Sequence, residues 1–410
     1  MLDPGKIEIS NYNYDLPDER IAKYPLKERD SSKLLVYKEG KIRPSNFKHI
    51  VDFLPENSLL VYNETKVVQA RIEFFKKTGA RIEIFCLEPV EPTSEIQLAF
   101  DQRETCVWKC FVGNGKKWKE QFLTKTIQIF KQEVEIKISK LEKSGNAQLV
   151  KFEWDGIYTF AEILEAIGQI PLPPYLNREA EPEDLVRYQT VFAKNKGSVA
   201  APTAGLHFTQ NILNKLPLKN ISSESLTLHV GAGTFKPVDC KQIQDHEMHT
   251  EQIVVELSSL KSIREKLGEN IIPVGTTSMR TLESLYWHGV KLVLNPDMSN
   301  SVDVKQWDPY GDYAKANISP LQALDAIIDR CEKENHKYIC GGTQLMIAPG
   351  YNYKIASGII TNFHQPKSTL LLLVSALIGE NWKKIYKYAL DNDFRFLSYG
   401  DSCLIFKTGQ

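Results

Sequence analysis

Several short apolar segments of the chain are followed at once by side chains that could take part in acid–base or binding chemistry. Residues 226–230 form one such segment, and strand alternation turns Thr227 and His229 to the face opposite its leucines. Gly231 and Gly233 come next, and glycines at this point allow backbone amides to approach a ligand closely. Because histidine exchanges protons near neutral pH, the segment predicts a functional strand end. A tight turn beside a buried, hydrogen-bonded histidine is the alternative interpretation.

Two later apolar segments, 271–274 and 359–360, end in the same manner. The polar residues that follow are Thr276, Thr277, Ser278 and Arg280 in the first case and Asn362, His364, Lys367, Ser368 and Thr369 in the second. Ligands of α/β proteins lie at the carboxyl ends of the strands, so three such ends predict one shared crevice. As an alternative, Thr277 or Ser278 would cap the helix that begins there.

Two loop-like segments extend the set of candidates. Residues 200–209 are rich in small side chains, which permit close packing against a flat ligand but are also typical of a structural loop. The candidates in this segment are Thr203, Gly205 and His207. Residues 398–401 form a glycine turn with Tyr399 and Asp401, where the carboxylate either serves the site or only caps the turn.

Two other interpretations remain open at this point. His246 and His249 are three residues apart, which suits a metal-dependent hydrolase, but the HExxH zinc pattern requires a spacing of four and a third ligand. Basic and aromatic residues are interleaved in 116–119 and 383–388, which suits a non-catalytic RNA-binding module or a solvated face. The sequence has neither a GxxxxGK(S/T) phosphate loop nor the full dinucleotide glycine fingerprint. We predict no metal.

The composition places these candidates on an ordinary globular chain. The 410 residues are 42% hydrophobic and 25% charged, which argues against disorder, collagen and coiled coil. Lys and Arg together number 51, as do Asp and Glu, so no net charge draws the whole molecule to nucleic acid. The seven cysteines form no CxxC pair, residues 1–15 lack an apolar core, and the most apolar stretch, 370–378, is shorter than the ~20 residues of a membrane span. We expect a cytoplasmic protein that does not enter membranes.

Two kinds of periodicity indicate how the chain is organised. From residue 67 to 155, apolar side chains recur at every second position without a long helical pattern, which predicts an all-β, barrel-like unit. From Thr159, which forms a capping box with Glu162, helical and strand-like runs alternate to the C-terminus. We therefore predict an α/β catalytic domain, made of residues 1–66 and 156–410, with an inserted β-barrel-like domain at 67–155.

Together these motifs resemble one family, the S-adenosylmethionine:tRNA ribosyltransferase-isomerases of queuosine biosynthesis. The matching segments run along nearly the whole chain. They are 14–17, 24–25, 29–31, 63–66, 70–71, 170–175, 188–190, 200–209, 226–238, Met248-His249 with Glu251, 274–284, 349–351, 361–373 and 398–401. The chain departs from the family pattern in a surplus near 291–320, in Gln365 where an apolar residue is expected, and in Glu247 where a second histidine is common.

The resemblance implies a reaction in which the ribosyl part of S-adenosylmethionine is transferred to 7-aminomethyl-7-deazaguanine in a tRNA anticodon and isomerised. Epoxyqueuosine-tRNA, adenine and methionine are the products, so S-adenosylmethionine is a substrate and no cofactor is implied. The sulfonium acidifies the adjacent ribose carbon, which requires a general base, and the departing adenine requires a proton or a hydrogen bond. The implied partners are S-adenosylmethionine and the anticodon region of tRNA, and we expect a monomer.

Within this resemblance we assign roles to the candidate residues. The expected catalytic residues are His207, His229, His364 and Asp401. The expected substrate-binding residues are Thr203, Gly205, Thr227, Gly231, Gly233, Thr276, Thr277, Ser278, Arg280, Asn362, Lys367, Ser368, Thr369 and Tyr399. We expect the His229 ring in the substrate crevice, close to His207 or to loop 361–369, and Arg280 or Lys367 at a carboxylate or a phosphate. Replacing Arg280 by alanine should then weaken binding with little effect on folding.

Overall fold

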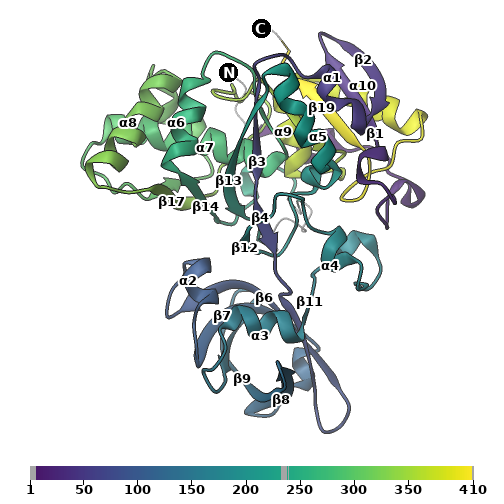
Figure 1. The fold of residues 1–410 in the computed structure, drawn as a ribbon, viewed down its shortest axis with the longest axis vertical. Coiled ribbons are helices and arrows are strands. Elements are labelled where there is room, and N and C mark those ends of the chain that lie inside the picture. Colours follow the sequence, from purple (N-terminus) through teal and green to yellow (C-terminus); the bar gives the residue numbers. More distant parts are fainter. Residues whose placement is uncertain (1–5, 232–237, 239, 409–410) are drawn as a thin grey trace.

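The computed structural model describes residues 6–231, 238 and 240–408. The molecule has a larger part, which holds the first and the last described residues, and a smaller part that projects from it (Figure 1). Within the described residues, no helix combines the length and apolar character that crossing a membrane requires.

The larger part is built on a six-stranded mixed sheet. Its strands, in spatial order, are β15 (Ile271–Pro273), β3 (Leu59–Asn63), β13 (Ser222–His229), β14 (Glu251–Glu256), β17 (Tyr338–Thr343) and β16 (Val302–Val304). Strands β15, β3 and β13 are parallel to one another, whereas β14 runs antiparallel to both of its neighbours. The helices that accompany this sheet are α6 (Leu257–Glu265), α7 (Thr276–Leu294) and α8 (Pro320–Lys333). Helix α8 packs against α6 and α7, which in turn contact the strands.

A second, four-stranded sheet stands beside the first. Its order is β18 (Gly358–Asn362), β19 (Ser402–Phe406), β1 (Lys33–Lys38) and β2 (Lys41–Asn46), with β1 parallel to β19. A parallel bridge between Val274 and Ile360 joins the end of β15 to β18. The carboxyl ends of β3, β13, β15 and β18 therefore point the same way, so the predicted strand ends do meet at one edge.

Smaller elements complete this part of the molecule. They are α1 (Ile50–Phe53), α4 (Asp184–Arg187), α5 (Gln210–Lys215), α9 (Thr369–Ile378), α10 (Asn381–Asp391) and the two-stranded parallel pair β4 (Thr65–Val67) and β12 (Asn195–Ser198). Side chains from both sheets and from the helices share one hydrophobic core, in which Leu35, Leu228, Leu282 and Phe363 are fully buried. The core thus fixes the strand ends against the helices that follow them.

The smaller part is a curled, antiparallel sheet with its own core. Its order is β11 (Gly168–Gln169), β5 (Arg71–Phe75), β6 (Arg81–Glu91), β7 (Thr105–Gly113), β10 (Ala147–Glu153), β9 (Gln132–Ser144) and β8 (Phe122–Ile129). Strands β5 and β8, distant in this order, also come into contact, so the sheet closes toward a barrel (Figure 1). Helix α3 (Phe160–Ile167) packs against both of them, and α2 (Ile96–Phe100) is the other helix in this region.

The sequence pattern explains why this part folds as it does. Val134, Ile136 and Ile138 are fully buried on one face of β9, while Glu133 and Glu135 are exposed on the other. The predicted capping box begins α3, because the Thr159 hydroxyl accepts from the Glu162 amide and the Glu162 carboxylate accepts from the Thr159 amide. The protein is therefore an α/β protein with a barrel-like part, as the periodicity predicted.

Candidate functional site

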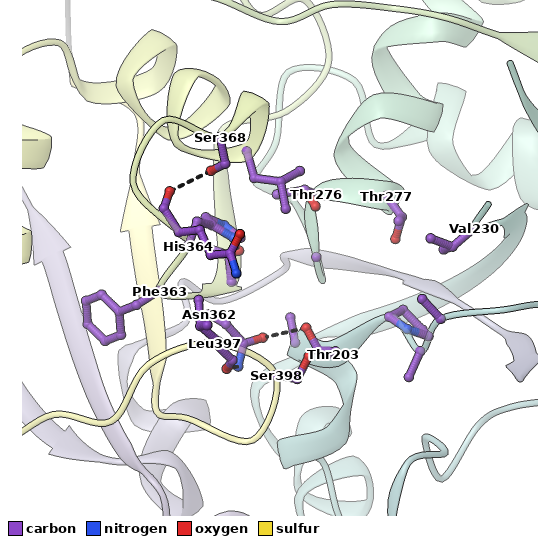
Figure 2. A pocket seen from close by; sticks show the side chains of 18 of the residues that line it. Thr203, Val230, Thr276, Thr277, Asn362, Phe363, His364, Ser368, Leu397 and Ser398 are labelled. Atoms are coloured by element: carbon purple, nitrogen blue, oxygen red, sulfur yellow. Dashed lines mark hydrogen bonds between the residues drawn. The ribbon is translucent and has the colours of Figure 1, made fainter. Parts of the chain in front are cut away.

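A pocket opens where the strand ends of the two sheets meet. It encloses about 870 Å³ of space between atoms, part of it open to solvent. Its wall includes Ala200–Ala204, Val230, Gly275–Thr277, Thr361–Gln365, Ser368–Leu370 and Leu397–Ser398, with Tyr175 and Tyr188. Thr276 and Thr277, Val230, Thr203 and Ser398, and His364 with Ser368 surround the space (Figure 2). The three predicted strand ends and loop 200–209 thus contribute to one site.

The first turn of α7 forms one wall of this pocket. Gly275, at φ +91°, turns the chain from β15 into the helix, a conformation that side chains other than glycine rarely adopt. The predicted caps are wrong, because no side chain caps α7 and the Ser278 hydroxyl donates to the carbonyl of Val274 at 2.9 Å. The Thr277 hydroxyl is buried without a hydrogen-bond partner among the described residues. The uncapped amides and the helix dipole therefore favour a negatively charged ligand group.

A second helix also begins at the pocket. Ser368 caps α9, since its hydroxyl accepts from the Leu371 amide at 3.2 Å, and Thr369 is the first helical residue. Both residues line the pocket, so the amino ends of α7 and α9 meet there. Two such ends strengthen the attraction of an anion, such as a carboxylate. Lys367, just before them, does not line the pocket, and its described contacts are made by its backbone amide and carbonyl.

Asn362 places its side-chain amide in the wall of the pocket. Its amide oxygen accepts from the Thr203 hydroxyl at 3.1 Å, and its amide nitrogen lies 3.1 Å from Nε2 of His207. On the other side of the ring, Nδ1 of His207 lies 2.9 Å from the Ser32 hydroxyl. Burial lowers the pKa of His207 to about 3, so the ring is neutral and orients Asn362 from behind. His207 itself does not line the pocket, so this geometry gives no support to its predicted catalytic role.

His364 is the one predicted catalytic histidine that lines this pocket. Its Nε2 lies 2.9 Å from the Thr361 hydroxyl, and its backbone amide donates a hydrogen bond to the hydroxyl oxygen of Tyr386 at 3.0 Å. Tyr14 donates to the carbonyl of the same residue. Burial lowers the pKa of His364 to about 3, so the ring is a neutral hydrogen-bonding group rather than a ready base.

The expected position of His229 is wrong. The ring lies on the opposite face of its strand from the pocket, with Nδ1 3.1 Å from the Thr65 hydroxyl. It packs so closely on Gly197 that a Cβ atom there would come within 2.4 Å of the ring. The alternation was predicted correctly, but it is Val230, next along the chain, that faces the pocket. Burial lowers the pKa of His229 to about 4, as expected of a buried structural histidine.

Tyr399 lines a smaller cavity next to the main pocket, and Asp401 lies in the turn that supports this cavity. Asp401 accepts from the Lys33 amide at 2.9 Å and from the Arg395 amide at 2.8 Å, so it secures the turn to β1. Tyr399 donates to Asp184 at 2.8 Å and lines the smaller cavity. Neither lines the main pocket, and for Asp401 the alternative interpretation, a turn cap, describes its contacts.

The remaining candidates, Thr227 and Gly205, have structural contacts outside the pocket. Thr227 accepts from Asn195 at 2.9 Å away from the pocket, and a Cβ at Gly205 would meet the Phe192 ring at 2.7 Å. Gly205 therefore serves close packing. Gly233 lies outside the described residues.

The surroundings of the basic and aromatic segments 116–119 and 383–388 do not support the RNA-binding hypothesis. Trp118 and Tyr386 are buried, so neither ring is free to stack on a base. Lys383 and Lys387 form ion pairs on the surface of α10, with N–O distances of 2.5 and 2.9 Å. These segments contribute a hairpin tip packed on the core and a solvated helix face.

A second cavity adjoins the first at Thr369 and Leu370 and encloses about 810 Å³ of partly open space. His246, His249 and Arg280 line it. Among the described residues, no group of three or more His, Cys, Asp and Glu side chains could hold a metal ion. The metal-hydrolase hypothesis therefore has two histidines in one cavity but no third ligand among those residues.

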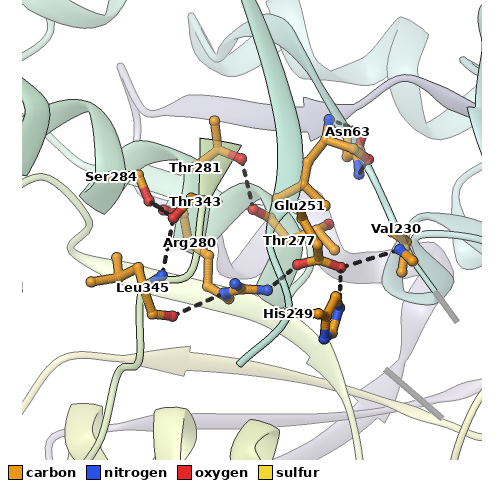
Figure 3. Close-up of polar contacts among 12 residues, drawn as sticks. Asn63, Val230, His249, Glu251, Thr277, Arg280, Thr281, Ser284, Thr343 and Leu345 are labelled. Atoms are coloured by element: carbon orange, nitrogen blue, oxygen red, sulfur yellow. Dashed lines mark hydrogen bonds and ion pairs between the residues drawn. The ribbon is translucent and has the colours of Figure 1, made fainter. Parts of the chain in front are cut away.

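A buried carboxylate organises the wall of this second cavity. Glu251 is paired with the Arg280 guanidinium, accepts from the Gly231 amide at 3.4 Å, and lies 3.3 Å from Nε2 of His249 (Figure 3). Burial by itself would raise the pKa of Glu251, but the interactions with Arg280 and His249 outweigh it and bring the pKa to about 2. Arg280 also donates to the Leu345 carbonyl at 3.2 Å, while its Nη2 has no partner among the described residues. Arg280 is thus half of a buried ion pair, which contradicts the expectation that it is dispensable for folding.

Sequence reasoning missed His249 and Glu251 as site residues. Glu251 is the first residue of β14 and His249 precedes it by two positions, and both lie beside Gly231. This spacing, together with a match to the family motif, was the available signal.

The fold and the site define an α/β protein with a small-ligand pocket at its strand ends, the arrangement typical of an enzyme. The chain belongs to the queuosine biosynthesis protein family, whose family model matches residues 9–405.

The curated relatives agree along their whole length. The chain is 37% identical over 406 residues to the S-adenosylmethionine:tRNA ribosyltransferase-isomerase of Halothermothrix orenii, covering 97% of this chain and 100% of the relative. It is also 37% identical to the enzyme of the same name from Trichlorobacter lovleyi, at 97% and 99% coverage, and 36% identical to that of Staphylococcus haemolyticus, at 97% and 100%. The crystal structure of an S-adenosylmethionine tRNA ribosyltransferase from Thermotoga maritima is similar with a TM-score of 0.46 and 24% identity, over 96% of this chain and 99% of that one.

Proposed function

We propose that the protein transfers and isomerises the ribosyl part of S-adenosylmethionine onto 7-aminomethyl-7-deazaguanine in tRNA, giving epoxyqueuosine-tRNA, adenine and methionine. The relatives that share its full length carry the name of this enzyme. The observation that carries the proposal is the main pocket, in which two helix amino ends meet a neutral, hydrogen-bonding wall. In this proposal S-adenosylmethionine is a substrate, and no cofactor takes part.

The two adjoining cavities suit the two ends of S-adenosylmethionine. The main pocket offers the Asn362 amide, the Thr203 hydroxyl and the His364 ring, which suit a base and a ribose. The methionine end carries a carboxylate, which we place at the shared boundary, near the amino ends of α7 and α9 and the Nη2 of Arg280, which has no partner in the part of the chain that the structure describes. In this arrangement Nη2 of Arg280 binds the substrate carboxylate, while Nη1 keeps its ion pair with Glu251.

We place part of the tRNA contact at the smaller cavity beside Ser398. Arg29, Arg187 and Arg395 line it, and Ser398 lines both this cavity and the main pocket. Arg29 donates to the Gln189 carbonyl at 2.6 Å, and among the described residues neither Arg29 nor Arg187 forms an ion pair with a carboxylate. Two such guanidinium groups next to the reaction site suit a tRNA phosphate. A monomer in the cytoplasm remains part of the proposal.

The domain arrangement is also proposed here. The seven-stranded sheet has its own hydrophobic cluster and lies between β4 and β12 along the chain, which supports an inserted domain. Helix α3 packs on this sheet and β11 pairs with β5, so we place the end of the insert near Gln169 rather than Asp155. The catalytic domain then consists of the two flanking segments.

The decisive experiment incubates the purified protein with S-adenosylmethionine and tRNA that carries 7-aminomethyl-7-deazaguanine. Release of adenine and methionine in equal amounts, with mass spectrometry showing the ribosyl addition on the tRNA, is the expected result. Binding of tRNA without adenine release would favour the RNA-binding module instead. Unmodified tRNA is the matched control and should release no adenine.

A further inference from the structure

The eight histidines of the chain occupy different surroundings. His207, His229, His288 and His364 are buried, and none of them has a carboxylate partner among the described residues. His49 and His336 pair with carboxylates at 3.6 and 3.4 Å, but their side chains are about half exposed and they line neither cavity of the site. His246 lines the second cavity, but it forms no ion pair with a carboxylate among the described residues. A histidine that takes up a proton needs access to its substrate and a partner for the resulting positive charge.

His249 combines both properties. It lines the second cavity, its side chain keeps 27% of its exposure, and Nε2 lies 3.3 Å from the buried carboxylate of Glu251. Nε2 faces Glu251 at ion-pair distance, although without the geometry of a hydrogen bond, and Nδ1 forms no hydrogen bond among the described residues. We assign the lone pair to Nδ1, because a proton on Nε2 then lies on the side of the carboxylate. Figure 3 shows Glu251 between His249 and Arg280. A base, an orienting carboxylate and a cation that fixes this carboxylate thus stand in one row.

We propose that His249 is the general base of the reaction and that Glu251 is its positioning residue. This inference rests on the function proposed above. The C–H bond of the ribose carbon beside the sulfonium breaks, its electron pair stays on that carbon, and its proton forms an N–H bond at Nδ1 of His249. The Glu251 carboxylate stabilises the imidazolium. The electron pair left on the ribose carbon forms a double bond to the adjacent ring carbon, whose bond to the ring oxygen breaks. The ring oxygen then forms a carbonyl with the sugar carbon that carried adenine, and adenine leaves with the electron pair of its glycosidic bond. His249 gives its proton to the nitrogen of the departing adenine, so His249 ends neutral.

The arrangement also explains why Glu251 is held so firmly. Its carboxylate is almost fully buried, and Arg280 and the Gly231 amide keep it ionised and fixed in place. An ionised partner stabilises the protonated form of His249, which lowers the barrier to proton uptake. Arg280 acts only through Glu251 in this step.

The test compares His249→Gln with His336→Gln, which alters a similar histidine–carboxylate pair outside the site. Single-turnover adenine release should fall about 10²- to 10⁴-fold in His249→Gln and stay unchanged in His336→Gln. Calorimetry should show S-adenosylmethionine binding within about threefold of wild type. Added imidazole should restore part of the rate to His249→Ala, which a purely structural role would not allow. Glu251→Gln should lower the rate at saturating substrate, and Glu251→Asp should recover part of it.

The outcomes separate this inference from the function on which it rests. If the wild-type protein releases no adenine, the proposed function itself fails. If the wild type is active and folded His249→Gln releases adenine within about threefold of its rate, the assignment of His249 is overturned and the function stands. Loss of substrate binding in His249→Gln, with a normal rate at saturation, would also overturn it. Should His249→Gln fail to fold, His249→Asn and the imidazole experiment decide in its place.

Discussion

Removing the Arg280 side chain should destabilise the folded protein strongly, because the change leaves Glu251 buried without its charge partner. Breaking a buried ion pair by removing one partner typically costs about 3–5 kcal/mol. The pKa of Glu251 gives a second route, since a fall from 4.5 to about 2 corresponds to roughly 3 kcal/mol of stabilisation of the ionised form. We expect Arg280→Ala to lower the free energy of unfolding by about 3 kcal/mol at pH 7.

Urea denaturation at several pH values measures this effect. In the wild type the pKa of Glu251 lies below its ordinary value, so its contribution is complete above about pH 4.5 and is lost as the pH falls toward 2. In Arg280→Ala the guanidinium no longer opposes the effect of burial, so the pKa of Glu251 should rise. As the pH falls, Glu251 should become protonated, and the variant should lose less stability because the buried charge disappears. The difference between wild type and variant should therefore shrink between pH 7 and pH 4.

A matched control exists on the surface. Arg264 pairs with Asp325 at 2.8 Å, but both side chains are about 40% exposed, so Arg264→Ala should lower the free energy of unfolding far less than Arg280→Ala does. A loss below about 1 kcal/mol in Arg280→Ala, or a difference from wild type that does not change with pH, would refute the reasoning. The double variant Arg280→Met with Glu251→Leu should recover much of the stability, because no unpaired charge remains.

Three further outcomes are expected. His229→Gln should lower the free energy of unfolding by about 1–3 kcal/mol and leave adenine release unchanged, because the ring contacts Thr65 and not the pocket; a large loss of rate in folded protein would contradict this. Glu283→Gln should cost about 2–4 kcal/mol in urea denaturation, since the buried carboxylate accepts the Tyr351 hydroxyl at 2.7 Å and three backbone amides, which an amide group cannot all accept. Asn362→Ala should weaken S-adenosylmethionine binding about 10-fold in calorimetry and also lower the melting temperature, because the His207 ring and the Leu397 carbonyl lose their partner; unchanged affinity of the folded variant would remove this residue from the site.

Local chemistry made much of the fold predictable. The capping box at Thr159, the alternation of β9 and the polar strand ends depend on residues a few positions apart, and each of these features is present in the structure. That the strand ends meet follows from a general property of α/β sheets rather than from any detail of this chain.

The faces of the strands were harder to assign. Alternation placed Thr227 and His229 together, but it does not say which neighbour covers which face. The His229 face is covered by Thr65 and Gly197, one of them more than 160 residues away along the chain. Arg280 lines the second cavity, and its ion pair with Glu251 joins a helix to a strand, so no pattern of neighbouring residues in the sequence indicates it. The partners of buried charged groups therefore could not be predicted from the sequence.

The position of β1 has a consequence for the order in which the molecule can be completed. This strand is made early, yet in the sheet it lies between β2 and β19, with Leu34 opposite Ser402 and Tyr37 opposite Ile405. During synthesis one edge of β1 must therefore wait, unpaired, for some of the last residues to leave the ribosome. Its buried side chains and open hydrogen-bonding edge make the unfinished chain prone to pair with other chains. Because β18 and the Asn362 wall also come late, the growing polypeptide has no finished pocket until nearly its full length has emerged.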